Sequence, residues 1–140
     1  MPQSKGIFSN HNCKIHNIIQ ECIDYLEELG YKNVYLIASE GTIQAGIFNK
    51  KSKKINFIHT KEDFLAIRKF IESVKQNNIT EQIIDEYVEF LSNVNEDVIV
   101  LGCTELPVLY DLCKKRINKK VIDPIDIVLD NLYAKFTHNQ

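Results

Sequence analysis

Hydrophobic residues along the chain alternate between short unbroken runs and longer stretches in which they recur every three or four positions. The unbroken runs lie at Lys14–His16, Asn33–Ala38, Ile55–His59, Asp97–Leu101 and Lys120–Ile122. Short apolar runs are typical of strands that are covered on both faces, as in parallel sheets. We therefore expect an α/β fold in which helices on both faces of a mostly parallel sheet make three layers.

Helix signals occupy the stretches between and after these runs. The 3.6-residue period predicts a first helix that ends near Gly30, and Thr60 with Asp63 has the spacing of a capping box before another. Thr80 is the expected N-cap of a third helix, and Asp123 that of the last. Apolar residues recur along one face of this last helix: Ile125, Val128, Leu129, Leu132 and Phe136.

Length and charge narrow the class of protein. The chain has 140 residues, which is enough for one domain, and we expect an irregular segment at 1–13 followed by a single domain at 14–140. Its 17 basic and 19 acidic residues are interspersed and give a net charge of −2, which argues against general nucleic-acid or membrane binding. No apolar run approaches the roughly 20 residues of a membrane span, and the first residues do not resemble a signal peptide. A cytoplasmic location is expected.

Cysteine and histidine spacing gives no sign of a metal site. The four cysteines include no C-x-x-C pair, and the four histidines are scattered outside any H-x-x-x-H arrangement. We expect reduced thiols and no bound metal.

Ligands of parallel α/β sheets gather at the carboxyl ends of the strands, where loops lead into helices. Four polar segments directly follow predicted strands: His16-Asn17, Ser39–Thr42, Gly102–Glu105 and Asp123-Pro124. Hydroxyls of Ser39 and Thr42, with Gly41 between them, could receive a carboxylate, although an N-cap and tight turn is the simpler explanation of these residues. Asp123 is explained by its capping position alone.

Cys103 is the strongest candidate for a catalytic residue. Gly102 before it would allow close approach of a ligand, and Thr104 and Glu105 are expected to begin a helix. A thiol at a helix N-terminus has a lowered pKa, so Cys103 would hold more thiolate than an ordinary cysteine. A small buried cysteine at the end of a strand is the equally weighted alternative.

Three stretches of the sequence resemble the aspartate/glutamate racemase family. The string from Val98 to Pro107 resembles its second catalytic-cysteine signature. Leu36–Thr42 and the following Gly46-Ile47-Phe48 resemble its central motif, with Ser39 where threonine is usual. Val121–Pro124 also matches in type and place, and the order and spacing agree from about Lys14 onward.

This resemblance implies a flavodoxin-like half of a cofactor-independent racemase acting on aspartate or glutamate. Two acid/base groups would flank the substrate α-carbon, and Cys103 would be one of them. Thr42 and Thr104 would hold carboxylate oxygens, and Glu105 would help to orient the site.

Family members begin with a further half-domain that bears the first catalytic cysteine, and nothing here matches it. Cys13 precedes its predicted strand and would lie at the wrong end of the sheet, whereas His16 lies at the right end and titrates near neutral pH. The missing half could come from a second polypeptide or a partner subunit, as in a homodimer. The alternatives are an inactive relative that binds a small carboxylate, and an α/β interaction module.

Overall fold

The computed structural model describes residues 18–138, and its centre is a four-stranded parallel sheet. The strands are β1 (Asn33–Ile37), β2 (Asn56–Ile58), β3 (Val98–Leu101) and β4 (Lys120–Ile122), in the order β2-β1-β3-β4. Four of the five predicted strands are thus confirmed. The expected strand at Lys14–His16 lies outside the described residues.

Helices connect the strands and follow the last one. The first described helix covers residues 18–28. The others are α2 (Glu40–Ala45), α3 (Ile47–Lys51), α4 (Phe64–Lys75), α5 (Glu81–Ser92), α6 (Leu106–Cys113) and α7 (Pro124–His138). Short 3₁₀ turns cover Lys61–Asp63 and Lys114–Arg116.

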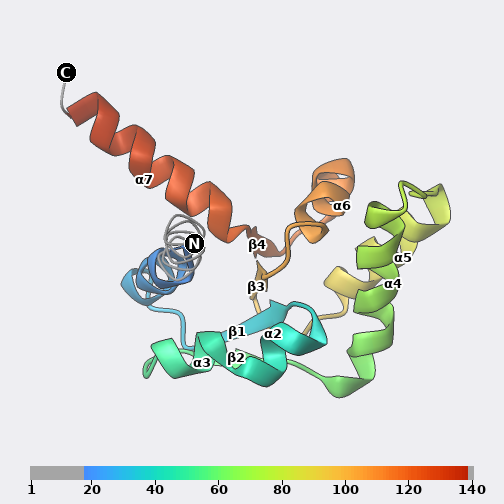
Figure 1. Ribbon diagram of the computed structural model, residues 1–140, viewed down its shortest axis with the longest axis horizontal. Coiled ribbons are helices and arrows are strands. Elements are labelled where there is room, and N and C mark those ends of the chain that lie inside the picture. Colours follow the sequence, from blue (N-terminus) through green and yellow to red (C-terminus); the bar gives the residue numbers. More distant parts are fainter. Residues whose placement is uncertain (1–17, 139–140) are drawn as a thin grey trace, which may run out of the picture.

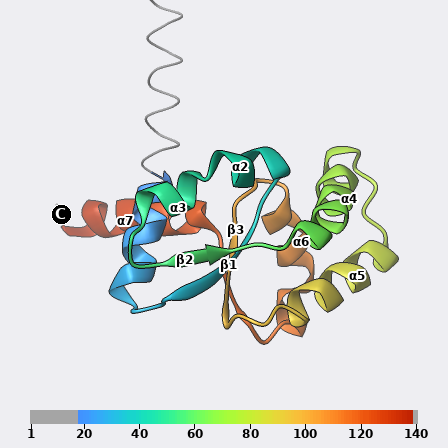
Figure 2. The same ribbon diagram turned by 90° about the horizontal axis from the view of Figure 1, so that it is seen from below.

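Both faces of the sheet are buried, which explains why its strands are apolar without interruption. Along β1, Val34 and Leu36 belong to one core cluster and Tyr35 and Ile37 to another, because successive side chains point to opposite faces. The first core lies under the helix at 18–28, α3 and the start of α7, and the second under α4, α5 and α6. Figures 1 and 2 show these two helical layers on either side of the sheet, as expected.

Gly102 is required by packing between neighbouring strands. Its N–H donates to the Ile37 carbonyl oxygen at 2.7 Å, and a Cβ at this position would lie 3.1 Å from side-chain atoms of both Ala38 and Leu36. The missing side chain at Gly102 thus allows β3 to approach β1 closely, and Gly102 also lines the cavity described below.

Of three predicted helix ends, two are confirmed and one is wrong. Gly30 ends the first helix with a φ of +83°, and the Thr80 hydroxyl accepts from the Ile83 N–H at 3.2 Å, both as predicted. The capping box is wrong, because Thr60 makes no side-chain cap and the Asp63 carboxylate instead accepts a hydrogen bond from the Tyr35 hydroxyl.

The apolar face that we predicted for α7 is largely exposed. Asp123 caps the helix, since its Oδ1 accepts from the Ile125 N–H at 3.1 Å. Ile127 packs into the core, whereas Leu129, Leu132 and Phe136 are 56%, 52% and 72% exposed. The reason is that α7 leaves the edge of the sheet after β4 and projects away from the body, so only its first turns reach the core (Figure 1). Among residues 18–138, no helix is both long enough and apolar enough to cross a membrane.

Candidate active site

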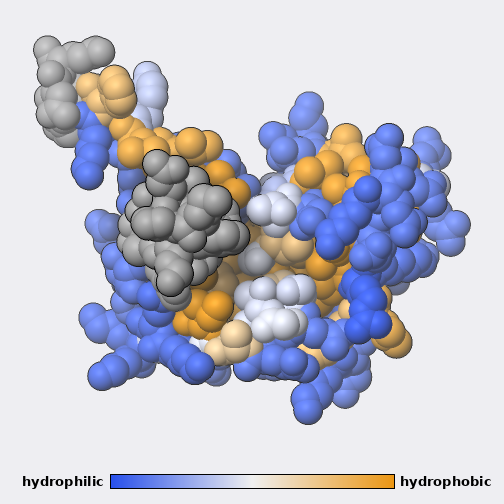
Figure 3. All heavy atoms as spheres, in the orientation of Figure 1, coloured by the Kyte–Doolittle hydropathy of each residue, from blue (hydrophilic) through white to orange (hydrophobic). Residues whose placement is uncertain are grey.

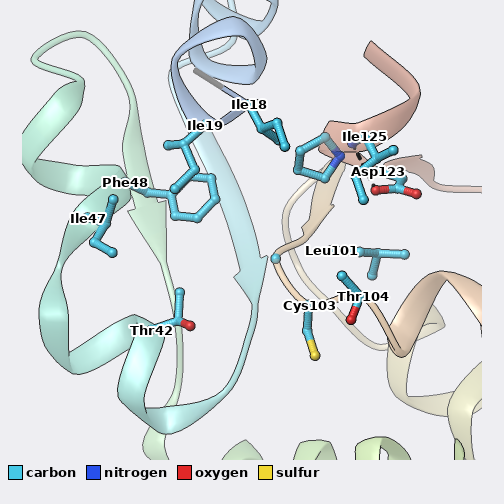
Figure 4. Close-up of a pocket in the computed structure, with 12 residues that line it drawn as sticks. Ile18, Ile19, Thr42, Ile47, Phe48, Leu101, Cys103, Thr104, Asp123 and Ile125 are labelled. Carbon is cyan, nitrogen blue, oxygen red and sulfur yellow. Dashed lines mark hydrogen bonds between the residues drawn. The ribbon is translucent and has the colours of Figure 1, made fainter. Parts of the chain in front are cut away.

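The carboxyl ends of β1, β3 and β4 meet around one cavity of about 270 Å³. Figure 4 shows Thr42 on one side of it and Cys103 with Thr104 on the other. The face of the molecule drawn in Figure 3 is hollowed near its middle, where apolar side chains are visible. The apolar walls of the cavity come from the first described helix, α3, β3 and the start of α7: Ile18, Ile19, Ile47, Phe48, Leu101, Pro124 and Ile125.

Cys103 is half-buried and its thiol is held by a carboxylate. The Sγ donates to Glu105 Oε2 at 2.7 Å, and the Thr104 hydroxyl donates to the same oxygen at 3.1 Å. Burial first, and then the hydrogen bond to Glu105, raise the pKa of the Cys103 thiol to about 11. Our expectation of a lowered pKa is therefore wrong for this structure, and Cys103 is a neutral thiol at pH 7.

The helix after Cys103 starts later than predicted, which explains part of this difference. It begins at Leu106, so Thr104 and Glu105 precede it rather than forming its first turn. The backbone N–H groups of Glu105 and Leu106 do act to lower the pKa of the Cys103 thiol, but burial and the carboxylate outweigh them.

Glu105 carries the negative charge of this pair. The hydrogen bond from the Cys103 thiol is the main cause that lowers the pKa of its carboxyl group, and the positive charge of Lys75 on α4 adds to it. The proton therefore rests on sulfur. Lys75 was not singled out from the sequence, because nothing in the local pattern of α4 indicates that its last turn lies near the β3 loop.

The Ser39–Thr42 segment forms the helix N-cap and tight turn that we considered beside a carboxylate site. Ser39 is the N-cap of α2, its Oγ accepting from the Thr42 N–H at 3.4 Å and lying 3.1 Å from the Thr42 hydroxyl. Thr42 lines the main cavity, whereas Ser39 faces a neighbouring cavity together with Arg68 and Lys75. Gly41 is exposed and has open space around its α-carbon.

The structure thus brings Thr42, Cys103 and Thr104 around one cavity, with Glu105 bound to the thiol. Asp123 also lines this cavity, and burial raises the pKa of its carboxyl group. His16 lies outside the described residues. Within the part of the chain that is described, no group of three or more metal-ligating side chains comes together.

Comparison with known proteins points to one family. The profile of the Asp/Glu/Hydantoin racemase family matches residues 11–132. Glutamate racemase of Bacillus cereus is 29% identical over 93 residues, covering 64% of this chain and 34% of that protein. Glutamate racemase of Carboxydothermus hydrogenoformans is 28% identical over 112 residues, covering 76% of this chain and 42% of that protein.

Solved structures show the same fold. Aspartate racemase of Picrophilus torridus superimposes with a TM-score of 0.60 at 30% identity, covering 76% of this chain and 46% of that one. Glutamate racemase of Francisella tularensis, solved in complex with D-glutamate, gives a TM-score of 0.57 at 21% identity, covering 87% of this chain and 47% of that one. The chain spans less than half the length of each of these relatives. Because the family profile covers most of its residues, this chain belongs to the Asp/Glu/hydantoin racemase family.

Proposed function

We propose that this protein acts in the cofactor-independent racemisation of an acidic amino acid, aspartate or glutamate, with Cys103 as one of two acid/base groups. The observation that carries the proposal is the half-buried Cys103 thiol, bound to Glu105 beside a cavity that Thr42 and Thr104 also line. Thiols in such a position can exchange a proton with a substrate carbon held in the cavity.

The protonation state of Cys103 fits the donor role in this reaction. One group removes the α-proton of the substrate, so that the C–H bond breaks and its electron pair spreads into the adjacent carboxylate. The Cys103 thiol then gives its proton to the opposite face of the carbon and becomes a thiolate. In the reverse direction the thiolate takes the proton from the substrate carbon, and Glu105 orients the sulfur whenever the thiol is protonated.

The carboxylates of an acidic substrate need hydrogen-bond donors and positive charge. We assign the hydroxyls of Thr42 and Thr104 to the α-carboxylate, because both line the cavity with Cys103; the Thr104 hydroxyl would turn from Glu105 to the substrate on binding. Ser39 holds Thr42 in place through its cap, and Gly41 lies in the same turn. Lys75 acts on Glu105 through its charge but lines the neighbouring cavity with Ser39, so we assign no residue to the second carboxylate.

The second acid/base group has to lie across the substrate from Cys103, and the remaining walls of the cavity offer only Asp123 among ionisable side chains of residues 18–138. Asp123 already caps α7. We therefore propose that the second group comes from outside these residues, either from His16 or from a complementary half on another polypeptide or subunit. The exposed Leu129 and Leu132 on α7 offer such a partner an apolar surface.

A second function is supported by the raised pKa of Cys103. A thiol that stays neutral up to about pH 11 is a poor base, which suits a relative that binds a small carboxylate without inverting it. An α/β interaction module is a third possibility, for which the exposed face of α7 is the supporting observation.

Deuterium exchange separates these functions. The purified protein is incubated in D₂O with L- or D-aspartate or glutamate, and loss of the α-proton signal is followed by NMR. We expect slow exchange that Cys103→Ala abolishes and that Cys113→Ala, a change at a buried thiol bonded to the Leu109 carbonyl, leaves intact.

Other outcomes point elsewhere. Interconversion that survives Cys103→Ala contradicts the role of this thiol. Binding seen by calorimetry without exchange favours the carboxylate-binding relative, and neither binding nor exchange favours the interaction module.

A further inference from the structure

β2 is an outer strand of the described sheet, so one side of its backbone faces away from every other described strand. The edge of a sheet leaves N–H and C=O groups that need partners of another kind. The Asn56 N–H points inward, since it donates to the carbonyl oxygen of Lys32, just before β1, at 2.8 Å. Backbone groups of successive residues point to opposite sides of a strand, so those of Phe57 point outward, away from β1.

A side chain of α3 occupies this outward side of β2. Asn49 Nδ2 donates to the Phe57 carbonyl oxygen at 3.2 Å, and Asn49 Oδ1 accepts from the Phe57 N–H at 3.1 Å. An amide side chain carries both a donor and an acceptor, so one residue satisfies both backbone groups of Phe57. Asn49 therefore takes the place that a neighbouring strand would take at this position of the edge.

The same amide attaches α3 to the sheet. α3 has five residues, and a helix this short is not stable without contacts to the rest of the fold. The Phe48 ring packs against the Phe57 ring, with centroids 5.2 Å apart, and Ile47 packs against the same core. Within residues 18–138, the two bonds of Asn49 are the hydrogen bonds that join α3 to a strand.

α3 is also a wall of the cavity beside Cys103. Figure 4 shows Ile47 and Phe48 across the cavity from this thiol. Apolar packing buries the two side chains but tolerates small shifts of the helix, whereas a hydrogen bond weakens steeply when its distance or angle changes. Asn49 is not a lining residue itself, so any effect that it has on the cavity passes through α3.

We propose that Asn49 is a positioning residue for the cavity: by bonding to both backbone groups of Phe57, it holds α3 in one place on the edge of β2 and keeps Ile47 and Phe48 in the cavity wall. The effect on a substrate rests on the proposed function. The effect on α3 does not, since amide exchange is measured without any substrate.

The test replaces Asn49 with alanine and follows hydrogen exchange of single backbone amides by NMR. The Phe57 N–H loses its acceptor, and its exchange should accelerate about fivefold or more relative to that of the Asn56 N–H in the same strand. The Ser52 N–H donates to the Phe48 carbonyl oxygen at 3.2 Å and reports on the last turn of α3, so its exchange should accelerate as well.

Two results of this test overturn the proposal. Unchanged exchange at Phe57 in N49A would mean that the amide does not protect the edge. Faster exchange at Phe57 with unchanged exchange at Ser52 would mean that apolar packing alone holds α3 in place.

Two control variants separate positioning from general loosening. Lys50→Ala shortens the exposed neighbour of Asn49 on the same helix and should leave both rates unchanged. Leu109→Ala weakens the core on the other face of the sheet, and should lower the free energy of unfolding without changing the Phe57 rate relative to that of Asn56. A change in this ratio as large as that in N49A, in either control, contradicts the proposal.

One measurement needs no variant and stands if N49A does not fold. In the wild type the Phe57 amide, although it faces the outer side of β2, should exchange at least about tenfold more slowly than an unprotected amide. Exchange at the unprotected rate overturns the proposal.

The consequence for a substrate is measured by α-proton exchange in D₂O. N49A should raise the substrate concentration that gives half-maximal exchange more than it lowers the maximal rate, because the cavity wall binds the substrate and does not move the proton. The reverse pattern overturns the assignment to the cavity wall. If N49A loosens α3 while the wild type exchanges no substrate α-proton, the proposed function fails and the positioning role stands.

Discussion

At the scale of single residues, the state of Cys103 follows from its neighbours rather than from its own chemistry. Sequence reasoning located the thiol at the end of a strand but gave its pKa the wrong direction. The N-terminal effect of a helix depends on where the helix starts, and α6 starts three residues after Cys103. The side-chain conformation of Glu105, which brings its carboxylate to 2.7 Å from the sulfur, has no signature in the sequence.

The influence of Glu105 on the thiol can be tested directly. Glu105→Gln keeps an acceptor oxygen but removes the negative charge that helps to raise the pKa of Cys103. The pKa should fall, and alkylation of Cys103 by iodoacetamide at pH 8 should become about threefold faster or more, the equivalent of half a pKa unit. Asp111→Asn, which removes an exposed charge from α6, is the matched control and should have no effect. Equal or slower alkylation in E105Q would contradict the assigned cause.

At the scale of elements, the strands were predictable and the outer face of α7 was not. The runs from Asn33 and Asp97 are apolar because both faces of the sheet are covered. Such short unbroken apolar runs are typical of strands in parallel sheets, so they could be predicted from the sequence. The period of α7 correctly predicts a helix with an apolar face. It carries no information on whether the fold covers that face, since this depends on the direction in which α7 leaves β4.

Shortening the side chain to alanine at two nearby positions of α7 should therefore change the free energy of unfolding by very different amounts. Ile127→Ala removes a buried side chain and should lower the free energy of unfolding by about 2–4 kcal/mol. Leu129→Ala, on the exposed face, should change it by less than about 0.5 kcal/mol. Urea unfolding measures both. Similar costs for the two variants would mean that the outer face of α7 is covered in the folded protein in solution.

At the scale of the whole molecule, buried thiols and phenols link stability to alkaline pH. Burial is the main cause that raises the pKa of Cys22 from 9.0 to about 12, that of Cys103 from 9.0 to about 11, and that of Tyr35 from 10.0 to about 12. Each group stays protonated in the folded chain while it ionises in the unfolded one. Their contribution is complete below about pH 9 and is lost as the pH rises toward 12.

We expect the free energy of unfolding to fall steadily between pH 8 and pH 10. Cys22 alone should account for roughly 1 kcal/mol of this loss, because pH 10 is one unit above its unfolded pKa. Urea unfolding of the wild type and of Cys22→Ala at both pH values measures the difference. The pH-dependent loss should be smaller in C22A, whatever its stability at pH 8, and an identical loss would show that Cys22 ionises normally in the folded protein.

The pairing of Cys103 with Glu105 also sets part of the charge beside the cavity, to which the Asp123 carboxyl group contributes as well. The two side chains share one proton and hold one negative charge from acidic pH up to about pH 11, since the pKa of Glu105 is lowered and that of Cys103 is raised. A dicarboxylate approaching the site is repelled by this charge, and Lys75 offsets only part of it. Added salt shortens the reach of such repulsion from about 10 Å at 0.1 M to about 3 Å at 1 M. Capture of an acidic ligand should thus be helped, rather than hindered, by moderate ionic strength.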